Sequence, residues 1–80
     1  MSIADLVSGQ KATIIDVSSP TIPLKLLEMG CLPGNYVEVI KIAKIKDPLY
    51  LNVNDTFLAI RLETAKEILV EPINVQHEAS

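Results

Sequence analysis

Short runs of β-branched and aliphatic residues, each ended by a turn signal, most limit what this 80-residue chain can fold into. The run at residues 11–17 ends before Ser19-Pro20, and the alternating run at 49–53 ends at Asn54-Asp55. Asparagine and aspartate both tolerate positive φ, so Asn54-Asp55 predicts a two-residue hairpin turn. The pattern therefore predicts a mainly β chain.

Five strands are expected from this pattern. Their ranges are 11–17, 36–45, 49–53, 56–62 and 68–70. Within the second range, the polar residues change sides near Lys41, which predicts a bulge or a bend there. Five short strands joined by tight turns predict a small barrel, a form that suits a chain with 49% hydrophobic residues.

A short helix is predicted between the first two strands. Pro23 fits its first turn, because the missing N–H costs nothing there, and Gly30 fits the left-handed position just after it. A second helical turn is expected at residues 63–67, before the last strand. The apolar row expected to pack on the barrel consists of Leu24, Leu27 and Cys31.

The other apolar side chains of this helix predict a binding surface. Leu26, Met29 and Leu32 lie off the inward row, so they are expected to face outward as a docking site for a partner protein. Pro48 and Tyr50, at the hairpin turn that leads into the third strand, are expected to extend it. Two alternatives stay open, namely that these residues only complete the core or that they form a homo-oligomer contact.

Composition argues against several classes of protein. The net charge is −3, and Lys41, Lys44 and Lys46 form the only local basic cluster without making a continuous stripe, so nucleic-acid binding is not expected. No apolar run approaches the roughly 18 residues of a membrane helix, and the first residues do not resemble a signal peptide. We therefore expect a cytoplasmic protein without direct membrane insertion.

Catalytic and metal-binding patterns are not found in the sequence. The one histidine, His77, lies in a polar tail at residues 74–80 that is expected to be frayed. The one cysteine, Cys31, has no base nearby in sequence, and a lone cysteine is most often a buried apolar side chain. No catalytic residue, metal site or cofactor is predicted.

One segment carries most of a resemblance to a known family. Residues 24–34 read LKLLEMGCLPG, which resembles the RLLELGLLPG segment of FeoA domains. Asp47-Pro48-Leu49, then Leu58-Ala59-Ile60-Arg61, then Ala65-x-x-Ile68-x-Val70 follow in that family's order. Lys25 stands where arginine is usual, and Cys31 replaces an aliphatic residue. The resemblance spans roughly residues 5–72.

The resemblance implies a fold and a function. The fold is a mainly β, SH3-like barrel over residues 1–73, with one short helix between strands one and two and a helical turn before the last strand. The function is that of a non-enzymatic cytoplasmic accessory protein of bacterial ferrous iron uptake. It would bind the GTPase-bearing part of the FeoB permease and modulate its activity or assembly. The alternative is a metal-responsive SH3-like module that binds Fe²⁺ or Mn²⁺ itself.

Overall fold

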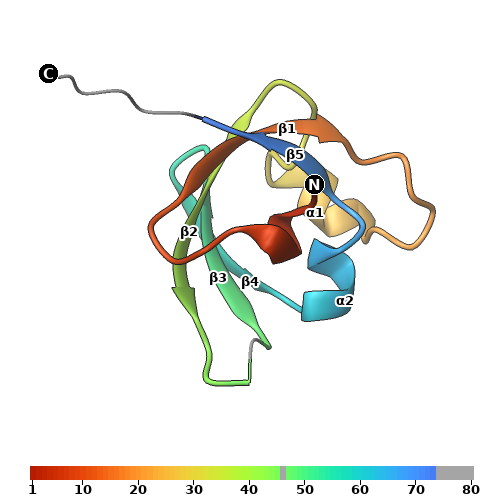
Figure 1. Cartoon of the computed structure of the whole chain (residues 1–80). Coiled ribbons are helices and arrows are strands. Elements are labelled where there is room, and N and C mark those ends of the chain that lie inside the picture. Colours follow the sequence, from red (N-terminus) through yellow and green to blue (C-terminus); the bar gives the residue numbers. More distant parts are fainter. Residues whose placement is uncertain (46, 74–80) are drawn as a thin grey trace, which may run out of the picture.

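The computed structural model describes residues 1–45 and 47–73 and consists of a curved antiparallel sheet with short helical segments packed against it (Figure 1). In chain order the elements are η1 (Ile3–Asp5), β1 (Lys11–Asp16), α1 (Leu24–Glu28), β2 (Tyr36–Ile42), β3 (Leu49–Val53), β4 (Thr56–Ile60), α2 (Leu62–Ala65) and β5 (Leu69–Pro72). The tail predicted at residues 74–80 lies outside the described residues.

The strands form one five-stranded sheet in the order β4-β3-β2-β1-β5, and every neighbouring pair is antiparallel. The curvature of the sheet brings the two helices and η1 against its concave side (Figure 1). This mainly β, five-strand arrangement, with a helix after β1 and a helical turn before β5, confirms the fold that the sequence predicted.

The bulge predicted near Lys41 is present in β2. Val39 pairs with Leu51 and Lys41 pairs with Tyr50, so the register shifts between them and Ile40 is the extra residue. A bulge places two residues opposite one and bends the strand. As a result Ile40 and Lys41 are both exposed, although they are neighbours in sequence.

The hairpin predicted at Asn54-Asp55 is also confirmed. The two residues have φ of 54° and 64°, and Val53 and Thr56 pair directly on either side of them. Positive φ at both central positions defines a type I′ turn, whose twist matches that of the flanking strands. This turn fixes the register of β3 against β4.

Three strands end earlier than predicted, β1 by a single residue at Asp16 and β2 and β4 by more. β2 stops at Ile42 instead of residue 45, because the chain turns there and the Ala43 N–H donates to the carbonyl of Pro48 at 3.3 Å. β4 stops at Ile60 instead of residue 62. The Leu62 N–H donates to Oδ1 of Asp47 at 3.1 Å, and this hydrogen bond caps the start of α2.

The N-terminal residues form a single helical turn, η1, which the sequence did not predict. Ser2 donates its backbone N–H to Asp5 Oδ2 at 2.9 Å, and this capping box holds the single turn η1. Ile3 is fully buried as a consequence. The largest fully buried side chains are those of Ile3, Ile14, Leu49, Leu51, Ile68, Val37, Val39, Val53 and Cys31.

Candidate functional site

Helix α1 is held at its end by a Schellman motif. The Cys31 N–H donates to the Leu26 carbonyl at 3.0 Å, and the Gly30 N–H donates to the Leu27 carbonyl at 3.1 Å. Gly30 has φ of +106°, the left-handed conformation that this motif requires. The side chain of Asn35 donates to the Gly30 carbonyl at 2.8 Å and secures the turn that follows.

This motif decides which side chains of α1 point inward. Leu26 is 9% exposed and Cys31 is fully buried, while Leu24 is 67% exposed. The prediction that Leu24 packs on the barrel and Leu26 faces outward was therefore wrong. The motif commonly pairs an apolar residue at its sixth position with the residue at its first, and Cys31 and Leu26 occupy those positions. The burial predicted for Cys31 is confirmed.

A small gap separates α1 from the end of β4. It has a volume of about 270 Å³, and its lining residues are Pro23, Lys25, Leu26, Ala59, Ile60, Arg61 and Thr64. Lys25 and Arg61 are both exposed, so two positive charges stand at the border of this gap. The exposed Leu24 lies one residue from Lys25 on the same helix.

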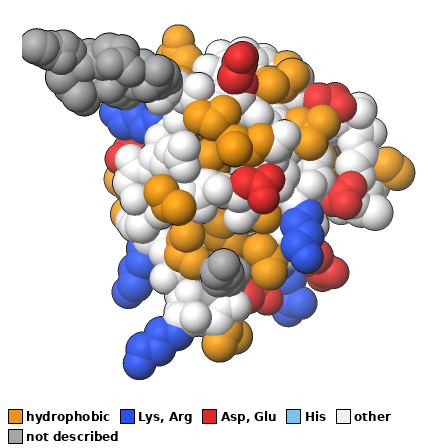
Figure 2. Space-filling view, viewed as in Figure 1, with side chains coloured by type: hydrophobic (Ala, Val, Ile, Leu, Met, Phe, Trp, Pro, Cys, Tyr) orange, Lys and Arg blue, Asp and Glu red, His pale blue; other side chains and the backbone are white. Residues whose placement is uncertain are grey.

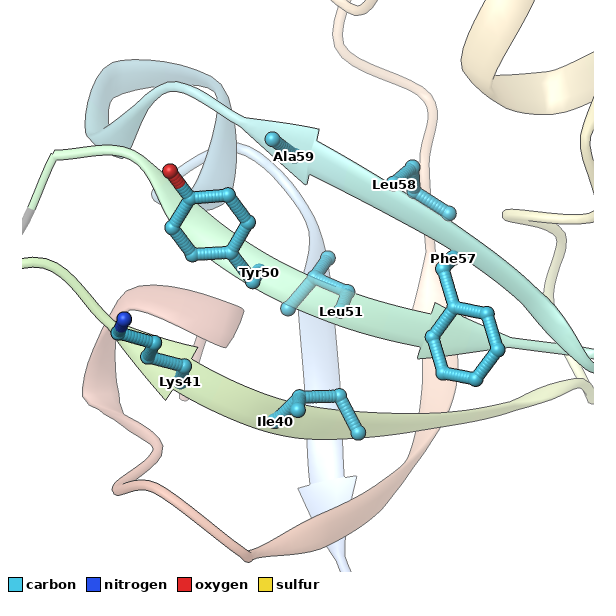
Figure 3. Close-up of a pocket in the computed structure, with 7 residues that line it drawn as sticks. All are labelled: Ile40, Lys41, Tyr50, Leu51, Phe57, Leu58 and Ala59. Carbon is cyan, nitrogen blue, oxygen red and sulfur yellow. The ribbon is translucent and has the colours of Figure 1, made fainter.

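A larger groove lies on the convex face of β2, β3 and β4. Its volume is about 500 Å³, and its lining residues are Ile40, Lys41, Tyr50, Leu51, Phe57, Leu58 and Ala59. Figure 3 shows the side chains of Ile40, Tyr50 and Phe57 spread across these three strands, with Lys41 beside Tyr50. Phe57 is 73% exposed, so this groove carries an aromatic side chain open to solvent.

The residues predicted for partner binding do not form one cluster. Leu26 is buried, Met29 and Pro48 are half-buried, and Leu32 and Tyr50 are exposed. Tyr50 lies in the groove of β2, β3 and β4, whereas Leu26, Met29 and Leu32 belong to α1 and the turn after it.

Sequence reasoning missed several exposed apolar residues. These are Leu24 on α1, Ile40 on β2 and Phe57 on β4. The bulge at Ile40 and the alternation of Phe57 with the neighbouring β4 residues were the signals available in the sequence.

The one thiol of the chain is buried within the described core. Burial raises the pKa of the Cys31 thiol, so this group stays protonated at neutral pH. Within residues 1–45 and 47–73, no group of three or more His, Cys, Asp or Glu side chains could hold a metal ion.

The face shown in Figure 2 carries hydrophobic side chains in its middle, with carboxylates among them and lysines and arginines toward its rim. None of the helices in the described part of the chain is long and apolar enough to cross a membrane.

The sheet order, the bulged β2 and the helix inserted after β1 define a small SH3-like barrel domain. Among families with such a domain, the model for the FeoA domain matches residues 1–72. The chain belongs to the FeoA family.

Relatives with known names are consistent with this assignment. The chain is 33% identical over 75 residues to an Fe(2+) transport protein A/Fe(2+) transporter FeoB fusion protein of Porphyromonas gingivalis, a match that covers 92% of this chain and 9% of that protein. The chain thus spans about a tenth of the length of this curated relative.

Solved structures share the fold. Iron(II) transport protein A of Clostridium thermocellum is 30% identical, with a TM-score of 0.82 over 91% of this chain and 46% of that one. FeoA of Stenotrophomonas maltophilia, solved in complex with zinc, is 25% identical, with a TM-score of 0.76 over 89% of both chains.

Proposed function

We propose that this protein is a cytoplasmic accessory protein of ferrous iron uptake that binds the GTPase-bearing part of a FeoB-type permease. The observation that carries the proposal is the Porphyromonas gingivalis fusion, in which one polypeptide joins a relative of this chain to FeoB. Fusion holds two domains at high effective concentration, an arrangement that favours contact between them. The Stenotrophomonas maltophilia relative is itself described as a candidate activating factor of ferrous iron transport.

The docking surface proposed for this partner is the outer side of α1 and of the turn after it. Leu24 and Leu32 are exposed there, and Met29 is half-buried between them in sequence. Met29 is an adaptable apolar contact, because its side chain is long and polarizable. Leu26 is buried in the core beneath α1, so it is not part of this surface.

Charge limits the kind of partner surface that fits here. Lys25 and Arg61 stand at the border of the gap between α1 and β4, and the described part of that border includes no carboxylate. A partner surface with a carboxylate next to an apolar side chain would complement both features. Tyr50, in the groove of β2, β3 and β4, stays a predicted contact of this partner, and so does Pro48.

The proposal is tested with the purified cytosolic part of a FeoB-type permease and this chain. Leu24→Asp and Leu32→Asp place a charge in the docking surface and should each weaken binding by at least about tenfold. Val7→Asp is the matched control, because Val7 is 64% exposed on another part of the molecule, and it should bind as the wild type does. Circular dichroism verifies that all three variants fold. Equal binding by both leucine variants would remove α1 as the docking surface.

The second candidate, a module that senses Fe²⁺ or Mn²⁺ directly, gains no support from the described residues. Cys31, its most obvious ligand, is fully buried next to apolar side chains. Titration calorimetry with Fe²⁺ under anaerobic conditions separates the candidates. Saturable heat that is lost in Cys31→Ala would favour the metal-binding alternative.

A further inference from the structure

The two edges of the sheet are protected very differently. At the β5 edge, Ser2 forms a bridge with Leu69, and the Val70 N–H donates to the Met1 carbonyl at 2.8 Å. β5 also contains Glu71 and Pro72, a charge and a residue without an N–H. These features block the addition of another strand.

The β4 edge carries no such blocking feature in its own sequence, and α1 faces only its end, across the gap at Ala59 and Ile60. Its sequence, Thr-Phe-Leu-Ala-Ile at Thr56–Ile60, contains no charged residue and no proline. In the described residues, no backbone hydrogen bond joins this edge to an element other than β3. An exposed, apolar, uncharged edge strand is a template for pairing with another strand.

The hairpin turn determines which residues offer their backbone at this edge. In a two-residue hairpin, the residues that flank the turn form a hydrogen-bonded pair, and pairs then alternate along the ladder. Val53 and Thr56 flank this turn, so Phe57 and Ala59 occupy the pairs without hydrogen bonds to β3. The N–H and C=O groups of Phe57 and Ala59 therefore point toward the open edge.

We propose that β4 pairs with β4 of a second copy of this chain, antiparallel and centred on Leu58. In this register Phe57 lies opposite Ala59 of the second copy and Ala59 lies opposite Phe57, so all four edge-facing residues exchange backbone hydrogen bonds. Leu58 then lies opposite Leu58 of the second copy, on the other face of the joined sheet.

Side-chain size supports this register. Ala59 lies beside Tyr50 in the ladder and forms part of the groove of about 500 Å³. The small Ala59 side chain leaves space next to the Tyr50 ring. In the proposed pairing, the Phe57 ring of the second copy enters that space, and the arrangement repeats across the two-fold axis.

Charge also permits two identical chains to meet here. The protein carries a net charge of −3, which generally opposes self-association. β4 is uncharged, and the nearest charged residues in the ladder rows are Lys41 beyond Tyr50 and Glu38 beyond Asn52. The pairing therefore places no like charges directly opposite each other.

The available area predicts a weak dimer. Stable specific interfaces bury about 1,200–2,000 Å² in total. An aromatic side chain supplies about 150–250 Å², and Phe57 and Tyr50 are the main exposed apolar contributors from each copy. These four rings together supply at most about 1,000 Å², below that range, so we expect a weak dimer that forms only at submillimolar to millimolar concentration.

Sedimentation equilibrium of the purified chain up to about 2 mM tests the dimer. The wild type should pass from monomer to dimer over this range, and the dissociation constant of Phe57→Glu should be at least about tenfold higher than that of the wild type. Tyr36→Glu is the matched control. Tyr36 is 65% exposed and lies on β2, away from the open edge, so this variant should dimerise like the wild type.

A mixed sample tests the register. Phe57→Glu and Ala59→Lys should each dimerise more weakly than the wild type alone, and their mixture should form a tighter heterodimer, because the carboxylate introduced at position 57 would then lie opposite the ammonium introduced at position 59 of the other chain. Amide exchange at Phe57 and Ala59 should slow as the wild-type concentration rises.

Three results would overturn the proposal. They are a wild type that stays monomeric, a dimer that Phe57→Glu does not weaken, and a mixture that is no more dimeric than its components. Protection of this edge only on addition of a FeoB-type partner would assign it to that partner instead.

Discussion

The backbone N–H of Cys31 donates a hydrogen bond of 3.0 Å to the carbonyl oxygen of Leu26, and the side chains of both residues are buried. This contact closes α1 and turns its inward face toward the barrel. It also explains the position of the one cysteine, which fills an apolar place in the core at the end of the helix. The same contact leaves Leu24 and Leu32 on the outside.

Thiol labelling tests the burial of Cys31. Since the thiol is inaccessible and its pKa is raised, a disulfide reagent should react with the native protein at least about a hundredfold more slowly than with the urea-unfolded chain. The rates are followed by absorbance at pH 7. Similar rates in the two states would show that Cys31 is exposed.

The pH dependence of stability follows from the same group. Burial raises the pKa of the folded-state thiol, whereas the thiol of the unfolded chain titrates near its ordinary pKa of about 8.5. The contribution of Cys31 to stability is thus fully present below that pH. It is lost as the pH rises through the folded-state pKa, because the unfolded chain ionises first.

Urea denaturation of the wild type and of Cys31→Ala between about pH 7 and pH 10 measures this effect. The free energy of unfolding of the wild type should fall more steeply above about pH 8.5 than that of the variant. Parallel profiles for the two proteins would contradict the assignment to Cys31.

Gly30 combines two constraints that can be separated by substitution. Its φ is +106°, and an added Cβ would lie 3.4 Å from Cβ of Asn54 on the β3–β4 turn. Gly34 also has positive φ, at +95°, but an added Cβ there meets no atom within 4 Å. Gly34→Ala should cost about 1 kcal/mol from backbone strain alone, and Gly30→Ala should cost more. Equal losses in the two variants would show that the contact with the hairpin does not matter.

The two leucines of α1 should differ sharply in their contribution to stability. Leu26→Ala removes a buried side chain and should lower the free energy of unfolding by about 2–4 kcal/mol. Leu24→Ala removes an exposed one and should change it by no more than about 0.5 kcal/mol. A larger loss of stability in Leu24→Ala than in Leu26→Ala would show that Leu24, as the sequence predicted, packs on the barrel.

The parts of this fold that local chemistry determines could be predicted from the sequence. The Asn54-Asp55 turn, the bulge near Lys41 and the glycine after α1 each depend on a few adjacent residues, and all three are present. The residue at which α2 starts was harder to predict from the sequence. The side chain that caps this start belongs to Asp47, which is 15 residues away in the chain. The N-terminal turn η1 likewise depends on a distant contact, with Ile3 donating to the Ile68 carbonyl.

The candidate surfaces were harder to predict for a related reason. A helix of five residues presents every side chain within little more than one turn, so spacing alone does not decide whether Leu24 or Leu26 faces the core. The Schellman contact to Cys31 decides it. The groove at Phe57 requires knowledge of which strand lies at the edge of the sheet, and that order is a property of the whole barrel.

Uptake of radiolabelled ferrous iron by cells tests the central claim most directly. Cells that lack this protein but retain the FeoB-type permease should take up less iron, and the wild-type chain should restore uptake. The double variant Leu24→Asp, Leu32→Asp should leave uptake at the level of the deletion, whereas Val7→Asp should restore it. Unchanged uptake in the deletion strain, or full restoration by the folded double variant, would contradict a role in ferrous iron transport through this surface.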